Sequence, residues 1–181
     1  MIDFSLRLCD ENDLEVLCTL GRTTFDEAFR SMNREEDFEH YLQTAFSADT
    51  IARQLEDPES QFYLVETRKV DAALEDKIAV GYLKLNFGAA QNEAVGKHTV
   101  ELERIYVKQD YQGQGLGQRL IEQLEAMLRN TSATWLWLGV WEQNKAAIRF
   151  YLKNGFQAFD THSYWIGEDE QFDLMMRKRI I

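Results

Sequence analysis

A glycine-rich turn between a strand-like segment and an amphipathic helix constrains the fold of this chain more than any other feature. The turn reads Tyr111-Gln112-Gly113-Gln114-Gly115-Leu116-Gly117. Apolar side chains then recur at helical spacing, at Leu116, Leu120, Ile121, Leu124, Met127 and Leu128. Glycines let backbone N–H groups approach an anion that a Cβ would hold away, and the helix N-terminus adds partial positive charge. The turn is therefore a candidate pyrophosphate cradle, although a tight strand–helix turn also needs glycines for steric reasons alone.

The hydrophobic pattern around this turn predicts an α/β (α+β) fold built on a mixed sheet. Strands are expected at 4–8, 61–67, 78–87, 99–108, 134–140, 155–165 and 171–178. Helices are expected after capping residues at 10–13, over 35–54, from 116 onward and over 144–154. The central strand–helix–strand unit should cross over in the right-handed sense and make its two strands parallel. The flanking strands favour antiparallel pairing, with helices covering the sheet.

Length and composition fit one domain over residues 1–181. Hydrophobic residues make up 45% of the chain and charged residues 28%, close to the averages for globular domains. The sequence has no repeat, low-complexity tract or linker, and its single proline, Pro58, lies in an acidic break that marks a helix end. Polar hairpin loops are expected between 67 and 78 and around 167–170.

The net charge of −11 argues against nucleic-acid binding, because phosphates select surfaces rich in Lys and Arg. An acidic surface suits a cationic substrate, although solubility alone also explains it. No apolar stretch approaches the ~20 residues of a membrane span, and no basic region followed by an apolar run opens the chain. We therefore expect a cytoplasmic protein without membrane attachment. Cys9 and Cys18 are too few for a disulfide framework or a zinc site, so no metal is expected.

The strand before the turn shows a change in the parity of its apolar residues. In a regular strand Leu102 would point to one face of the sheet, whereas Ile105 and Val107 would point to the other. A β-bulge produces such a slip, bends the strand and leaves backbone groups unpaired, although an edge irregularity would give the same pattern.

Two motifs, in this order, resemble those of the GNAT superfamily of N-acetyltransferases. Gln112-x-x-Gly115-x-Gly117 is similar to the superfamily's pyrophosphate motif. The later segment Asn144-x-x-Ala147-x-x-x-Tyr151-x-x-x-Gly155-Phe156 is similar to its second CoA motif. The PaiA group of GNATs, which is associated with acetylation of spermidine and spermine, shows a closer resemblance at 24–29, 103–107, 137–142, 162–167 and 170–176.

The resemblance implies the GNAT fold and acetyl-CoA as co-substrate. That fold has about seven strands, mostly antiparallel, with a parallel central pair splayed for CoA and helices on both faces. Backbone N–H groups of the bulged strand would hold the pantetheine arm, the turn would hold the pyrophosphate, and Asn144 would bond the pantetheine. The CoA-binding residues implied are Ile105, Tyr106, Val107, Gln112, Gly113, Gln114, Gly115, Leu116, Gly117, Gln118, Asn144, Lys145, Tyr151 and Lys153. For Lys145 and Lys153, an exposed position without function is an equal alternative.

The resemblance also places Tyr151 beside the CoA sulfur, as the acid that protonates the departing thiolate. No cysteine lies in the motif region, so we expect direct attack of the amine on the thioester in a ternary complex. Glu101 and Glu103 are the candidate bases; either could act through water, hold a cationic amine, or simply face solvent. Some relatives that acetylate protein N-termini carry a glutamate in place of Gly139, so the glycine weakens that assignment.

The substrate expected is a small-molecule primary amine, with polyamines favoured. The alternatives are acetylation of protein N-termini or lysines, and a regulatory protein that senses CoA. His162 falls in a late strand on the expected substrate side, although an ordinary strand histidine is the favoured interpretation. Members of the superfamily often dimerise through late strands, so the resemblance is compatible with a homodimer.

Overall fold

The computed structural model describes residues 3–68, 77–166 and 169–180, which form two compact units. Unit 1 contains residues 1–85 and 104–116, and unit 2 contains residues 86–103 and 117–181. The seven strands follow the order β1-β2-β3-β4-β5-β7-β6, and strand β4 (Thr99–Val107) contributes its first half to unit 2 and its second half to unit 1. The expected hairpin loops at 69–76 and 167–168 lie outside the described residues.

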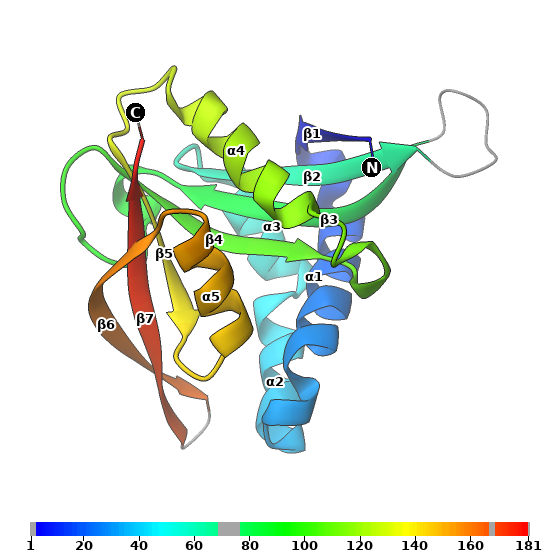
Figure 1. Ribbon diagram of the computed structural model, residues 1–181. Helices are drawn as coiled ribbons and strands as arrows, with labels where there is room; N and C mark the ends of the chain where they lie inside the picture. The colour runs from blue at the N-terminus through cyan, green and yellow to red at the C-terminus, as the bar shows by residue number, and fades with distance from the viewer. Residues whose placement is uncertain (1–2, 69–76, 167–168, 181) are drawn as a thin grey trace. The chain divides into compact units, whose positions relative to one another are not determined.

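Unit 1 combines three helices with an antiparallel strand pair (Figure 1). Strand β1 (Phe4–Leu8) pairs with β2 (Ser60–Arg68), and β3 (Lys77–Asn86) follows along the chain. Its helices are α1 (Leu14–Phe29), α2 (Glu35–Ala45) and α3 (Ala48–Glu56). Short 3-10 helices occupy Glu11–Asp13, Arg30–Met32 and, in the second half of this unit, Gln109–Tyr111.

The single helix expected over 35–54 is wrong, because the chain forms two helices there. The first helix ends at Ala45, and Ser47 starts the second by accepting a hydrogen bond from the Thr50 N–H at 3.2 Å. A serine at this position satisfies one of the N–H groups that a new helix leaves unbonded. The apolar stripe continues across the break, since Phe46 is 1% exposed in the core of the unit.

Aromatic rings fill the core of unit 1. Phe25 lies near the centre of this cluster, with its ring centroid 5.7 Å from that of Phe38 and 5.6 Å from that of Phe46. The ring of Tyr106, from the second half of β4, contacts Phe25 edge-on at 6.2 Å. Such contacts add to the burial of apolar area, so they fix the second half of β4 against the helices of its own unit.

Unit 2 contains the parallel strand pair and the C-terminal hairpin. Residues Thr99–Glu101 of β4 run parallel to Trp135–Trp137 of β5 (Trp135–Trp141). Strand β7 (Asp169–Arg179) pairs antiparallel with both β5 and β6 (Gln157–Ile166). The helices of this unit are α4 (Leu116–Leu128), which begins at the unit boundary, and α5 (Lys145–Lys153), with a 3-10 helix at Gly88–Ala90. The mixed sheet with a parallel pair confirms the expected α/β fold.

The two faces of the sheet in unit 2 have different roles. Lys178 of β7 bonds the Glu125 carboxylate of α4, so the even-numbered side chains of β7 face that helix. Figure 1 shows α5 next to β5 and β7. The odd-numbered residues Asp173 and Met175 therefore point to the opposite face, together with their cross-strand neighbours Trp141 and Gly139. This second face carries a polar pocket.

The β-bulge expected between Leu102 and Ile105 stays a prediction, as does the single domain over 1–181; the register shift that the structure shows lies in β6, between Ala158 and Asp160. Among the helices in the described ranges, none is long and apolar enough to cross a membrane.

Candidate active site

Two glycines of the glycine-rich turn have a left-handed backbone conformation. Gly113 has φ of 72° and Gly115 has φ of 76°, a left-handed conformation that side chains with a Cβ rarely adopt. A Cβ added at either glycine would meet no atom within 4 Å, so the positive φ, rather than close packing, favours glycine at these positions. Gln112 donates from its Nε2 to the Val107 carbonyl at 2.7 Å, which ties the turn to the end of β4. The side chain predicted for pyrophosphate thus braces the loop in this structure.

The second motif caps helix α5. The Asn144 Oδ1 accepts a hydrogen bond from the Ala147 N–H at 3.0 Å, and Lys145 bonds the Glu142 carbonyl at 2.6 Å. Lys153 is exposed in the last turn. Of the other predicted residues, Gln114 bonds the Asp110 carbonyl and Gln118 bonds Glu122. The CoA-binding role of all these residues stays a prediction.

Tyr151 lies in α5 with 9% of its surface exposed, between the rings of Phe150 and Phe156. Burial raises the pKa of its phenol well above the ordinary value. The hydroxyl is therefore protonated at neutral pH, as a proton donor must be.

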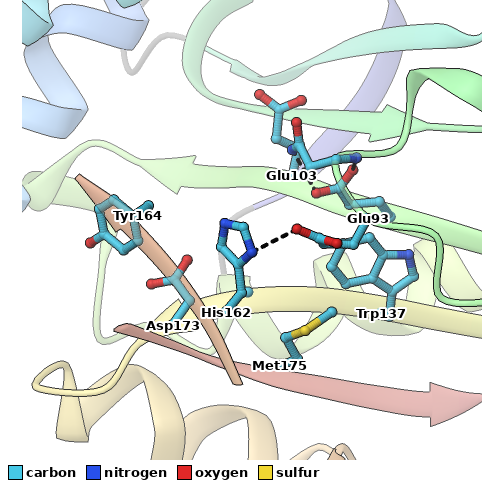
Figure 2. Close-up of a pocket in the computed structure, with 10 residues that line it drawn as sticks. Glu93, Glu103, Trp137, His162, Tyr164, Asp173 and Met175 are labelled. Carbon is cyan, nitrogen blue, oxygen red and sulfur yellow. Dashed lines mark hydrogen bonds and ion pairs between the residues drawn. The ribbon is translucent and has the colours of Figure 1, made fainter. Parts of the chain in front are cut away.

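A pocket of about 320 Å³ opens on the odd-numbered face of the sheet in unit 2 (Figure 2). Strands β4, β5, β6 and β7 and the loop before β4 all contribute to it. Its lining combines carboxylates with aromatic and apolar side chains: Asn92, Glu93, Glu101, Glu103, Trp137, Gly139, His162, Tyr164, Asp173 and Met175. The two candidate bases expected from the sequence, Glu101 and Glu103, thus lie in one pocket.

Glu101 is 3% exposed, and both of its oxygens accept hydrogen bonds. Asn92 donates to it from the backbone N–H and from Nδ2, both at 2.8 Å, and Asn86 donates from Nδ2 at 3.1 Å. The same Asn86 amide donates to Glu103 at 2.6 Å. Burial raises the pKa of Glu101, while its hydrogen bonds lower it. Glu101 therefore anchors the loop that closes one side of the pocket.

The opposite wall holds His162 and Asp173, which are register partners on β6 and β7. The His162 Nδ1 lies 2.6 Å from Glu93 Oε1, as Figure 2 shows. Burial raises the pKa of the Asp173 carboxyl to about 6, although the nearby His162 charge lowers it. The Tyr164 hydroxyl lies 2.9 Å from Gln171 Oε1, which fixes its ring at the edge of the pocket.

Asp173 and Glu93 are pocket residues that sequence reasoning missed. One signal for Asp173 was available: it lies two residues from the buried Met175, so it occupies a core-facing position of its strand, where an acid is unexpected. Glu93 comes from an irregular loop, so no periodicity could place it. Within the described ranges, no group of His, Cys, Asp and Glu side chains is arranged to hold a metal ion; the absence of a metal stays a prediction.

Comparison with known proteins identifies the family. The model of the acetyltransferase (GNAT) family matches residues 24–156. The chain is 36% identical over 171 residues to an uncharacterized N-acetyltransferase of Lactobacillus delbrueckii subsp. lactis from the pepI 3′ region, covering 94% of each chain. It is 24% identical over 160 residues to a spermidine N(1)-acetyltransferase of Thermoplasma acidophilum, covering 88% of this chain and 92% of that one.

A solved structure shows the same fold. The PaiA N-acetyltransferase of Thermoplasma acidophilum, crystallised in complex with coenzyme A, aligns with a TM-score of 0.75 at 22% identity, covering 98% of this chain and 99% of that one. The chain therefore belongs to the GNAT acetyltransferase family, and the protein is an acetyl-CoA-dependent N-acetyltransferase.

Proposed function

We propose that the protein acetylates a primary amine of a polyamine such as spermidine or spermine, with the unit 2 pocket as the amine site. The observation that carries this proposal is the lining of the pocket, where four carboxylates stand beside apolar side chains: Glu93, Glu101, Glu103 and Asp173 with Trp137 and Met175. A polyamine alternates ammonium groups with methylene chains, so it needs acidic and apolar surfaces together. The net charge of −11 favours the approach of such a polycation.

The relatives support the same substrate class. The Thermoplasma acidophilum protein that matches most of this chain is named for spermidine N(1)-acetylation. The PaiA resemblance in five separate stretches of the sequence points the same way. The cytoplasmic location expected from the sequence, and the homodimer with which the resemblance is compatible, are part of the proposal.

The residues that match the family motifs would hold acetyl-CoA. The turn at 112–117 suits the pyrophosphate, because glycines let backbone N–H groups approach an anion and helix α4 begins within the turn, at Leu116. Residues 105–107 at the end of β4, and Asn144 at the start of α5, would hold the pantetheine arm. Acetyl-CoA supplies the thioester whose carbonyl carbon the amine attacks.

Two kinds of residue then act on the amine and the leaving group. Glu101 and Glu103 hold the cationic substrate through their charge, since both line the pocket. Tyr151 donates its phenolic proton to the departing sulfur; burial raises the pKa of this phenol and so keeps it protonated at neutral pH. Replacement of Tyr151 by Phe, which keeps the ring and its packing, should lower kcat by roughly 100-fold or more with little change in stability.

The test is release of the CoA thiol from acetyl-CoA in the presence of different amines. Spermidine and spermine are compared with propylamine, which has one ammonium group, and with peptides that offer an N-terminal or lysine amine. We expect kcat/KM for spermidine to exceed that for propylamine by roughly 100-fold, and to fall with added salt. Turnover of peptides alone would overturn the polyamine proposal while leaving acetyl transfer intact.

A further inference from the structure

The carboxylates of the pocket differ in the number of hydrogen bonds and ion pairs that their oxygens already make. Glu101 accepts hydrogen bonds from Asn86 and Asn92, and Glu103 accepts one from Asn86. Glu93 is paired with His162. Among the residues that the structure describes, the Asp173 carboxylate accepts no hydrogen bond, and its oxygens remain available to a ligand.

The backbone aims Asp173 into the pocket. It lies on β7 opposite Trp141 of β5, two residues before the buried Met175, and Figure 2 shows its carboxylate beside His162 and Tyr164. The space that it occupies exists because residue 139 is a glycine: a Cβ there would come within 2.8 Å of Asp173 Oδ2. The neighbouring strand thus leaves room for one oxygen of this carboxylate.

We propose that Asp173 accepts the proton that the substrate ammonium must lose before it attacks the thioester. This inference rests on the proposed function, because it assigns a role within the same amine site. An ammonium group has a pKa near ~10.4, like that of lysine, and only its neutral form is a nucleophile. A carboxylate with unoccupied oxygens inside an acidic pocket both attracts the cation and can take its proton.

The proposed acetyl transfer moves one proton to Asp173 and one to the leaving sulfur. One proton passes from the ammonium nitrogen to Asp173, and the neutral nitrogen forms a bond to the thioester carbonyl carbon. The carbon–sulfur bond breaks, and the sulfur leaves with a proton that Tyr151 donates. The second nitrogen proton restores the Tyr151 phenol, through solvent where needed. Asp173 then releases its proton to solvent, so each turnover yields one amide, one thiol and one free proton.

The surroundings of Asp173 suit this role. Desolvation raises its pKa to about 6, so the group is ionised at pH 7 to 8 but more basic than an ordinary carboxylate. The titratable groups that face the pocket with it are His162 and Tyr164 on β6, Glu101 and Glu103 on β4, and Glu93 in the loop before β4. The neighbouring residues on β5, Gly139 and Trp141, carry no titratable group.

The experiment is the pH profile of kcat/KM between pH 5 and 9.5 for wild type and Asp173→Asn. Wild type binds the amine in its protonated, ammonium form. Its kcat/KM should therefore fall below about pH 6, where Asp173 becomes protonated, and should be constant above that pH. Asp173→Asn should lose roughly 100-fold or more at pH 7.5. Its remaining activity should rise tenfold per pH unit up to pH 9, because the variant depends on amine that is already neutral in solution.

Two further variants separate this role from binding and from folding. Glu103→Gln removes a neighbouring negative charge, so it should raise KM for the amine and keep the loss of activity below pH 6. Asp160→Asn changes an exposed carboxyl on β6, outside the pocket, and should match wild type throughout. The dissociation constant of acetyl-CoA, measured by calorimetry, should stay within threefold of wild type in all of them.

The outcomes distinguish this inference from the proposed function. If Asp173→Asn keeps the wild-type profile and only raises KM, then Asp173 binds the substrate without taking its proton, and the inference is overturned. If wild type acetylates only peptides, the polyamine proposal fails, and the profiles measured with the peptide amine decide the role of Asp173. If wild type turns over none of these amines, both proposals are refuted.

Discussion

Replacement of Asp173 by Asn should stabilise the protein at neutral pH and change its stability by only about 0.5 kcal/mol at pH 4. The structure raises the pKa of this carboxyl from 3.8 to about 6, chiefly through desolvation. The folded protein therefore binds a proton more tightly than the unfolded chain does. Between these two pKa values, the folded state holds more protons than the unfolded state, so wild type loses stability as the pH rises through this window.

The size of the change in the free energy of unfolding follows from the shift in the pKa of Asp173. About two pKa units at 1.36 kcal/mol each give an upper value of about 3 kcal/mol at pH 8. The carboxyl is partly open to the pocket, where solvent screens its charge, so we expect about 2 kcal/mol. For a chain of 181 residues, this corresponds to a rise in Tm of roughly 4–8 °C. Asn has nearly the shape of the protonated acid, and at pH 4 the carboxyl is protonated in the folded protein, so the two proteins should then differ by only about 0.5 kcal/mol.

The assay is urea unfolding of wild type and Asp173→Asn at pH 4, 6 and 8, followed by circular dichroism. Asp160→Asn, an exposed carboxyl on β6, should differ from wild type by less than about 0.5 kcal/mol at every pH. An equal difference between wild type and Asp173→Asn at pH 4 and pH 8 would refute the reasoning, because packing rather than charge would then be responsible. A variant that is more stable but less active would show that the charge serves the reaction and not the fold.

Three other substitutions test separate parts of the structure. Gly139→Ala places a Cβ 2.8 Å from Asp173 Oδ2, so kcat/KM for the amine should fall by roughly 10–100-fold in steady-state assays. The KM for acetyl-CoA should not change. A variant with wild-type activity would contradict the role given to Asp173. Gly115→Ala forces a Cβ onto a residue with φ of 76°, so the free energy of unfolding should fall by about 1 kcal/mol. Calorimetry should also show weaker acetyl-CoA binding; an unchanged affinity would mean that the turn does not bind CoA. Asp13→Asn removes the negative charge and one of the two oxygens that accept hydrogen bonds from Arg7, bonds that lower the pKa of Asp13, so it should cost about 1.5–3 kcal/mol at pH 7. That stability is present above the ordinary pKa of the acid and is lost as the pH falls through the lowered one, so unfolding at pH 2 should show a smaller difference.

The sequence by itself determined the fold class and the family. Local patterns carry this information: period-two strands, the amphipathic helix, and the closely spaced glycines of the turn that precedes it. The strand at 4–8 and the helix from Leu116 have the bounds that the pattern predicts. The motifs around Gln112 and Asn144 lie on continuous segments, so they could be recognised without tertiary contacts. The break at Ser47 was missed, because the apolar stripe runs on through it.

Only the tertiary structure decided which acids share a pocket and what each one is bonded to. Glu101 was identified from its strand, but the loop residue Asn92 that occupies its oxygens has no periodic signal. Asp173 and Gly139 are 34 positions apart in sequence, and strand register alone brings them together. Proton affinity depends on burial and on the charges nearby, and both arise when separate strands pair. A sequence read residue by residue therefore names the candidate acids, whereas their surroundings select among them.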